Sequence, residues 1–214
     1  MTLSAHLEAA PLSVVLDVRY PLAALALSPT LELAGSLGLD VNWLPLSVPA
    51  LNPPSEPGPG DDRGIRHRRF RAQAIAREIE TYSAAQGLVM REWYRDGDAG
   101  AAHMGWLWVR DRHRDALPGF LRSLFGAYWS LDLDASSVEW VARLVDSADA
   151  DGASFAAWCA SDGPVALDAL EDELRAFGLH QVPAYVVGDE VFIGRQHLPM
   201  IRWTLEGRTG ALPI

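Results

Sequence analysis

The sequence predicts an α/β fold in which strands from both ends of the chain form one sheet, with a long helical segment inserted between them. Three observations carry this prediction. A buried β-branched run followed by a helix opens the chain, and a proline-rich segment then leads into about a hundred residues of helical periodicity. The last fifty residues return to a pattern of helix, two short strands and helix.

The first strand is expected over residues 12–17 (LSVVLD), which Pro11 precedes. A helix should begin at Pro21, because proline is favoured at the first helical position, where its missing N–H group costs nothing. Pro29 falls inside this helical pattern and should kink it. A second strand is expected over residues 41–46 (VNWLPL), and Pro45 favours an edge position for it.

A linker is expected at residues 47–64, which contain five prolines. From Ile65 to about Asp162 the apolar residues recur at helical spacing, for example at Leu121, Leu124 and Tyr128. We therefore expect an all-helical insertion domain at residues 59–163.

The C-terminal fifty residues predict a helix that Gly178 ends, strands at 184–187 and 190–193 around a Gly188-Asp189 turn, and a final helix from about Leu198. Strand, helix and strand at one end, with helix, hairpin and helix at the other, is the arrangement of a thioredoxin-like fold. We expect this domain to comprise residues 1–58 and 164–214.

Composition narrows the range of functions. The 214 residues are 49% hydrophobic and 21% charged, which is typical of a folded domain with a sizeable core. The net charge of -10 argues against a nucleic-acid partner. All 18 basic residues are arginine, which excludes mechanisms that need a lysine amine, such as Schiff-base chemistry.

Cys159 is the only cysteine, so no internal disulfide and no dithiol redox chemistry are possible within one chain. Its apolar helical setting predicts a buried, inert thiol. The spacing of His103, His113 and His180 suggests no metal site, and a structural or exposed role is expected for each. Residues 1–10 carry no positively charged leader, and no apolar run is long enough to cross a membrane, which favours a cytoplasmic protein.

Three stretches of the sequence resemble one family: DVRYPLAALALSP at 17–29, LFGAYW at 124–129 and GLHQVPAYVVGDEVFIGRQHL at 178–198. In order and spacing they are similar to motifs of the DsbA-like branch of the thioredoxin superfamily. The similarity is greatest to its 2-hydroxychromene-2-carboxylate isomerases and kappa-class glutathione transferases.

The resemblance implies a ligand site formed by Val182 and Pro183, where the family keeps a cis proline. In that geometry the backbone of Val182 faces the pocket and can pair with a peptide-like ligand such as glutathione. A trans bond at the start of a strand is the alternative from the pattern alone.

Tyr20 occupies the position of the family's catalytic serine or cysteine, at the N-terminus of the first helix. A tyrosine is a poor nucleophile at neutral pH, but it can donate a hydrogen bond to a bound thiolate. The alternative is that Tyr20 packs in an inactive site.

In glutathione-binding relatives the segment at Arg195 and Gln196 helps to hold the γ-glutamyl end. Gln196 replaces the family's aspartate, and Arg195 could favour a ligand carboxylate. An ordinary surface loop is the alternative here.

The insertion contributes two further candidates. Five arginines between residues 63 and 71 form either an anion-binding rim or a solvated helix face that pairs with Glu78 and Glu80. Tryptophans at positions 93, 106, 108, 129 and 140 either line a cleft for an aromatic substrate or belong to the core.

The resemblance implies an isomerase or transferase that depends on glutathione or another low-molecular-weight thiol and acts on an aromatic or anionic small molecule. No metal is expected, and a homodimer is possible by analogy with kappa-class relatives. One alternative is a catalytically degenerate DsbA-like binding protein. A disulfide oxidoreductase acting through Cys159 on a partner is another, and it requires an exposed thiol of low pKa.

Overall fold

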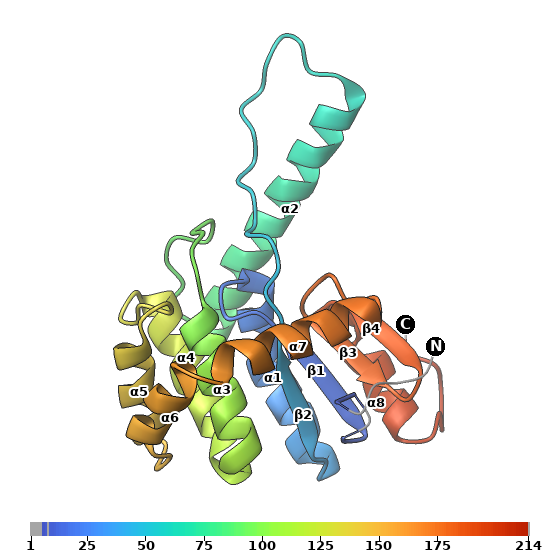
Figure 1. Cartoon of the computed structure of the whole chain (residues 1–214). Helices are drawn as coiled ribbons and strands as arrows, with labels where there is room; N and C mark the ends of the chain where they lie inside the picture. Colours follow the sequence, from blue (N-terminus) through green and yellow to red (C-terminus); the bar gives the residue numbers. More distant parts are fainter. Residues whose placement is uncertain (1–5, 8, 214) are drawn as a thin grey trace.

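The computed structural model describes residues 6, 7 and 9–213. Of the N-terminal residues 1–10, in which no leader is expected, residues 1–5 and 8 lie outside the described part of the chain. A four-stranded sheet with the order β2-β1-β3-β4 forms the centre of the thioredoxin-like part (Figure 1). The strands are β1 (Leu12–Leu16), β2 (Val41–Pro45), β3 (Ala184–Val187) and β4 (Glu190–Ile193). β1 runs parallel to β2 and antiparallel to β3. Strands from both ends of the chain therefore share one sheet, and the predicted α/β fold is confirmed.

Helix α1 (Pro21–Leu37) begins at Pro21, as predicted, and ends at Gly38, which adopts the left-handed conformation with φ 62°. The helix continues past Pro29. Because Pro29 has no N–H group, the carbonyl of Leu25 lacks its usual helical donor. The side chain of Gln86 supplies a donor instead, with Nε2 at 3.1 Å from the Leu25 oxygen.

The chain after Val48 and the N-terminal part of the helix that follows form an arm that stands out from the body (Figure 1). The chain rises as an extended proline-rich segment and returns as α2 (Arg63–Gln86). This helix begins two residues before the expected Ile65, because Asp62 caps it by accepting a hydrogen bond from the Ile65 N–H group. Arg69 fastens the extended segment to α2 through the carbonyls of Ser55 and Glu56 and an ion pair with Asp61.

The inserted helices after the arm are α3 (Gly100–Arg112), η1 (Arg114–Ala116), α4 (Leu117–Ser130), α5 (Val138–Asp146) and α6 (Gly152–Cys159). Trp106, Phe120 and Phe155 are fully buried among them. The indole of Trp106 donates to the Trp43 carbonyl of β2 at 3.2 Å, which ties α3 to the edge of the sheet. The helical block and the sheet therefore share one continuous core.

Helix α7 (Gly163–Ala176) returns the chain to the sheet, and η2 (Arg195–His197) and α8 (Leu198–Leu205) follow β4. The Gly194 N–H group donates to the carbonyl of Pro183 at 2.8 Å. The end of β4 is thus fixed beside the start of β3. Within the described residues, no helix has the length and apolar character needed to cross a membrane.

Candidate functional site

The chain segments predicted to form a site converge at one end of the sheet. β1 pairs with β3 through Val15 and Ala184, so the Val182–Pro183 segment that precedes Ala184 lies level with the end of β1. From that end of β1, residues 17–20 lead directly into α1. The Val182–Pro183 peptide bond is cis. Tyr20 and the Val182 backbone therefore lie at the same end of the sheet.

Tyr20 is the N-cap residue of α1, and its carbonyl accepts hydrogen bonds from the N–H groups of Ala23 and Ala24. The side chain is partly buried, and its hydroxyl makes no hydrogen bond with any described residue. Burial raises the pKa of Tyr20, and the nearby charge of Arg71 only partly opposes this effect. The phenol is therefore protonated at neutral pH, and its O–H group is a free donor.

Arg195 is held against α2. Its Nη2 atom lies 3.0 Å from Glu78 Oε1, and its guanidinium carbon lies 3.5 Å from the ring centre of Tyr82. Only 16% of the Arg195 side chain is exposed. The predicted carboxylate-binding group is thus already paired with a carboxylate of the chain itself.

Gln196 is also engaged within the chain. Its Nε2 atom donates to the Ile193 carbonyl at 3.0 Å, and the side chain folds over Gly194. This hydrogen bond uses one of the two N–H groups of the Gln196 amide and leaves its Oε1 atom free to accept.

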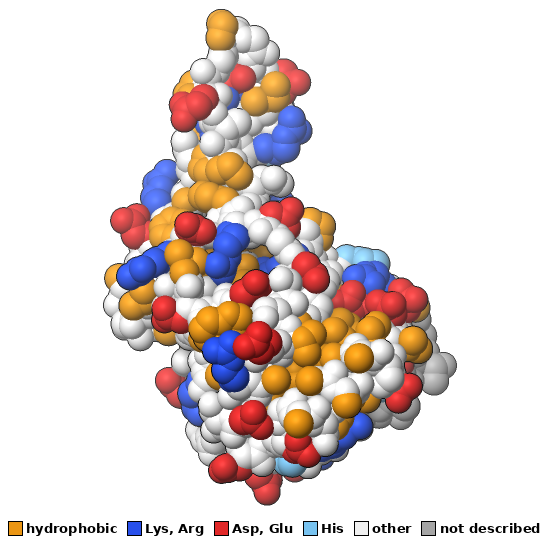
Figure 2. Space-filling view, turned by 60° about the vertical axis from the view of Figure 1, so that its left-hand side comes forward, with side chains coloured by type: hydrophobic (Ala, Val, Ile, Leu, Met, Phe, Trp, Pro, Cys, Tyr) orange, Lys and Arg blue, Asp and Glu red, His pale blue; other side chains and the backbone are white. Residues whose placement is uncertain are grey.

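The arginines at the start of α2 divide into two groups. Arg69 is buried and structural, whereas Arg63, Arg66, Arg68 and Arg71 are exposed and form no ion pair with a described residue. The expected pairing of this face with Glu78 does not occur, because Glu78 pairs with Arg195. Figure 2 shows blue basic side chains on the arm, which stands clear of the body.

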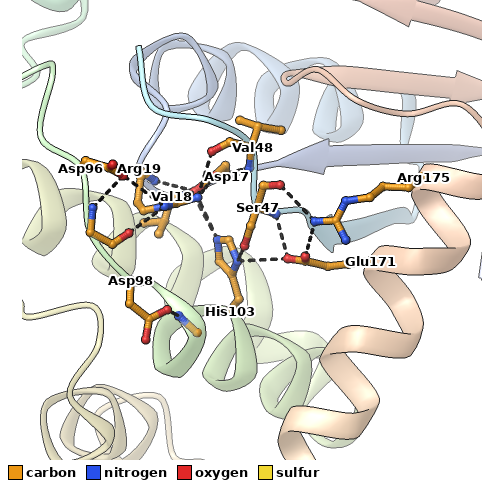
Figure 3. A network of polar contacts seen from close by, with 12 residues as sticks. Asp17, Val18, Arg19, Ser47, Val48, Asp96, Asp98, His103, Glu171 and Arg175 are labelled. Carbon is orange, nitrogen blue, oxygen red and sulfur yellow. Dashed lines mark hydrogen bonds and ion pairs between the residues drawn. The ribbon is translucent and has the colours of Figure 1, made fainter. Parts of the chain in front are cut away.

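A buried polar network surrounds Asp17, which directly follows β1 (Figure 3). Asp17 is 1% exposed, and Arg19 contacts both of its carboxylate oxygens, at 3.2 and 2.8 Å. The Val48 N–H group donates to Asp17 Oδ2 at 2.9 Å, and His103 Nε2 lies 3.4 Å from Oδ1. These contacts hold the turn that carries Tyr20.

The network continues on the other side of His103. Its Nδ1 atom lies 3.3 Å from the Ser47 hydroxyl and 3.9 Å from Glu171 Oε1. Glu171 also accepts hydrogen bonds from the Ser47 N–H group at 2.8 Å and from Arg175 at 2.6 Å. The end of β1, the segment after β2, α3 and α7 are thereby joined through polar groups.

Asp17 is ionised within this network. Burial alone raises the pKa of the Asp17 carboxyl, but the hydrogen bonds and charges of His103 and Arg19 outweigh it and hold the pKa well below its usual range. Sequence reasoning gave His103 only a structural or exposed role and did not find its partners. The signal that could have indicated the network is a polar residue directly after a strand of apolar residues, as at Asp17.

Cys159 is buried and unpaired, and burial raises its pKa to about 11. A thiol in this state is a poor nucleophile at neutral pH. Among the residues that the structure describes, no cluster of three or more His, Cys, Asp or Glu side chains could hold a metal ion.

The tryptophans of the insertion differ in their surroundings. Trp106, Trp108 and Trp129 belong to the buried core, Trp93 is partly buried and Trp140 is exposed. Trp129 also forms part of the wall of a cavity between α1 and α4. The tryptophans are therefore mainly core residues, with Trp129 the one that also lines this cavity.

The chain has a four-stranded sheet of the order β2-β1-β3-β4, a cis proline before β3 and a block of helices inserted after β2. These features define a thioredoxin fold with a helical insertion. The sequence matches the family of DSBA-like thioredoxin domains over residues 17–206. The chain therefore belongs to the DSBA-like thioredoxin family. No curated protein matches the sequence.

Solved structures show the same fold. A structure of 2-hydroxychromene-2-carboxylate isomerase superposes with a TM-score of 0.70 at 15% identity, covering 92% of this chain and 94% of that chain. A protein described as a probable DsbA oxidoreductase from Streptomyces coelicolor gives 0.67 at 17% identity, covering 96% and 93%. The cytosolic disulfide reductase DsbM from Pseudomonas aeruginosa, solved with GSH, gives 0.59 at 15% identity, covering 92% and 98%. At such identities the similarity establishes the fold alone.

Proposed function

We propose that this protein is a thiol-dependent isomerase or transferase that binds glutathione or another low-molecular-weight thiol and acts on an aromatic or anionic small molecule. The thiolate of the cofactor adds to the substrate, a bond of the adduct rotates, and the thiolate leaves again. No net oxidation occurs in this cycle, so it needs no second cysteine. The chain has a single cysteine, which is compatible with such chemistry but not with a dithiol mechanism, because that mechanism needs two cysteines.

The free hydroxyl of Tyr20 is the observation that carries the proposal. Tyr20 is the N-cap residue of α1, and the partial positive charge at a helix N-terminus favours an anion. The raised pKa of Tyr20 keeps the O–H group available as a donor to a bound thiolate. The Val182 backbone at the same end of the sheet would pair with the peptide portion of the thiol.

The first test is isothermal calorimetry with glutathione, followed by turnover of 2-hydroxychromene-2-carboxylate in its presence. We expect binding at millimolar concentration or below. Tyr20→Phe should lower turnover by about 100-fold, the usual cost of removing one donor that stabilises a developing anion. Tyr94→Phe removes a hydroxyl from another partly buried tyrosine and should leave the rate unchanged. A Tyr20→Phe variant that is folded and fully active would contradict the assigned role.

A second candidate function is a binding protein that has lost catalysis. Arg195 and Gln196 favour it, because each of them is held by a contact within the chain. Glutathione then produces no heat in the calorimeter and no thermal shift, and the same titration therefore separates the two functions.

A further inference from the structure

A cavity of about 350 Å³ lies between the last turn of α3 and the start of β2. Val41 and Asn42 of β2 line it, and these two residues pair with Leu12 and Ser13 at the start of β1. Tyr20 follows the other end of β1. The cavity therefore lies at the opposite end of the sheet from the site of the proposed function.

The lining of this first cavity carries an excess of positive charge. Arg110, Arg112 and Arg114 contribute three guanidinium groups, and among the described residues that line the cavity Asp111 is the only acidic one. This excess occurs in a chain whose net charge is -10. A phosphate group fits the combination, because it offers about two negative charges and several acceptor oxygens to a cluster of arginines.

Most N–H groups of these arginines have no acceptor in the part of the chain that the structure describes. Arg110 donates from Nε to Asp111 at 2.6 Å, but its Nη1 atom is buried and makes no hydrogen bond with a described residue. Only 15% of the Arg110 side chain is exposed, so water replaces the missing acceptors incompletely. Arg114 is exposed and forms no ion pair with a described residue. An anion held beside these guanidiniums would supply the acceptors.

Helix capping does not account for the arginines at the end of α3. An arginine in the last turn of a helix often donates to one of the last carbonyl groups. Neither Arg110 nor Arg112 makes such a bond within the described residues. The guanidinium carbon of Arg112 instead lies 3.8 Å from the ring centre of Trp108. A stacked guanidinium contacts the ring through its face, so the N–H groups at its rim remain available to an anion.

A second cavity, of about 430 Å³, adjoins the first one, because Val41, Arg114 and Leu117 line both. Leu31 and Leu39 add apolar side chains to the second cavity, and its two arginines and two aspartates together carry no net charge. A molecule that places a phosphate in the first cavity can therefore extend an organic group past Arg114 into the second.

We propose that the two adjoining cavities bind a phosphomonoester. Its phosphate group lies between Arg110, Arg112 and Arg114, and its organic group lies against Leu31 and Leu39. Neither a thiol nor the Tyr20 hydroxyl takes part in this binding, so the site goes beyond the proposed function and does not depend on it.

Calorimetric titration with phenyl phosphate, at constant ionic strength and without any thiol, tests the proposal. We expect a dissociation constant below about 1 mM. Inorganic phosphate fills only the first cavity and should bind at least about tenfold more weakly. Equal affinities for the two probes would assign the first cavity to free phosphate and reject the role of the second cavity.

Charge variants test the phosphate part of the site. Arg110→Gln should lower the affinity for both probes at least about tenfold, because a charged donor is lost. Arg63→Gln removes an exposed arginine that lines neither cavity and should have no effect. Asp111→Asn removes the opposing charge from the lining and should raise the affinity for both probes. Without phosphate, Arg110→Gln should not lower the melting midpoint, whereas replacing an arginine with a purely structural role would lower it.

Two helical glycines provide a matched pair of variants for the second cavity. A side chain added at Gly35 of α1 or at Gly119 of α4 meets no atom within 4 Å, but only Gly35 lines the second cavity. Leucine is a better helix former than glycine, so both variants should fold. Gly35→Leu should lower the affinity for phenyl phosphate about tenfold and leave that for inorganic phosphate unchanged. Gly119→Leu should bind both probes as the unchanged protein does.

Three results would overturn the proposal: no binding of phenyl phosphate to the unchanged protein at about 1 mM, full affinity in Arg110→Gln, or equal losses in Arg110→Gln and Arg63→Gln. Tyr20→Phe should bind phenyl phosphate normally. Binding of phenyl phosphate without binding of glutathione would reject the proposed function but leave this site standing, and the opposite pattern would reject only the site.

Discussion

Asp17 is a buried carboxylate whose ionised form is stabilised by the fold. It is almost fully buried and ionised, and it faces the guanidinium of Arg19 and the imidazole of His103. Removing one member of a buried ion pair leaves the other charge without compensation, and this generally costs more than the pair contributes. The stability of the turn that carries Tyr20 therefore depends on this one carboxylate.

Asp17→Asn should lower the free energy of unfolding by about 3–5 kcal/mol. Asp96 is the matched control, because it lies 3.9 Å from the same Arg19 side chain but is 82% exposed. Asp96→Asn should cost less than about 1 kcal/mol. Urea denaturation of the three proteins measures the difference, and equal costs for the two variants would contradict the assignment.

The Asp17 carboxylate should also make the free energy of unfolding depend on pH in the acidic range. The folded-state pKa of Asp17 lies below its unfolded value of about 3.9. Its contribution is therefore complete above that value and is lost as the pH falls toward the folded-state pKa. The free energy of unfolding should decrease between about pH 5 and pH 3, and this decrease should be smaller in Asp17→Asn. Urea curves at several pH values test it, and parallel pH profiles for the two proteins would be the contrary result.

At the scale of single elements, α2 contacts α1 at the point where Pro29 removes one backbone hydrogen bond of α1. Pro29 leaves the buried Leu25 carbonyl without its helical donor, and Gln86 at the end of α2 replaces it. A buried carbonyl without a partner is costly, so Gln86 and Pro29 should be energetically coupled.

Gln86→Ala should lower the free energy of unfolding by about 1–3 kcal/mol, the cost of an unsatisfied buried carbonyl. In a Pro29→Ala background, residue 29 regains an N–H group that can bond to Leu25, and the same substitution should cost less. A double-mutant cycle by chemical denaturation measures this coupling. Gln73→Ala on the same helix serves as the control, and strictly additive effects of Gln86→Ala and Pro29→Ala would show that no coupling exists.

The helices and strands whose ends are marked by turn or capping residues could be predicted from the sequence. The strands at 184–187 and 190–193 and the helix from Leu198 have the expected bounds, because a Gly-Asp turn and an N-terminal proline mark them. β2 lies at the edge of the sheet, as Pro45 indicated. The start of α2 was placed two residues late because the cap at Asp62 was not recognised.

The site was only partly predictable. The position of Tyr20 at a helix start follows from the Tyr-Pro step, and a family resemblance pointed to the Val182–Pro183 segment. His103, which contacts Asp17, lies on α3, and Glu78, which pairs with Arg195, lies on α2. Both contacts join residues that are far apart in the sequence, so no local pattern predicts them. The cavity beside Trp129 likewise depends on how two helices pack, which periodicity does not determine.

On the scale of the whole molecule, Arg195 connects the C-terminal elements to the helix of the arm. Its ion pair with Glu78 and its contact with the Tyr82 ring join η2, in the C-terminal segment, to α2, the first helix of the insertion. A partly buried cation that is both paired and stacked contributes more than an exposed ion pair.

Arg195→Ala should therefore lower the melting midpoint by about 2–4 °C for each kcal/mol lost, as expected for a protein of this size. Hydrogen exchange should increase in the C-terminal half of α2 before it increases in the sheet. Arg202→Ala removes an exposed i,i+4 pair with Glu206 and a hydrogen bond to Ser36, neither of which involves α2, and should leave hydrogen exchange in α2 unchanged. Unchanged exchange in α2 would show that the contact does not hold the arm.

The tip of the arm should tolerate changes in chain length that the sheet would not. Figure 1 shows its tip away from the sheet, and the chain there is an exposed proline- and glycine-rich turn that leads into a capped helix. Insertions or deletions at such a tip change loop entropy only slowly with length and leave strand register untouched. Related chains can therefore differ in reach at this tip while sharing the same interior, and a foreign peptide grafted between Pro57 and Gly60 would be displayed without disturbing the rest.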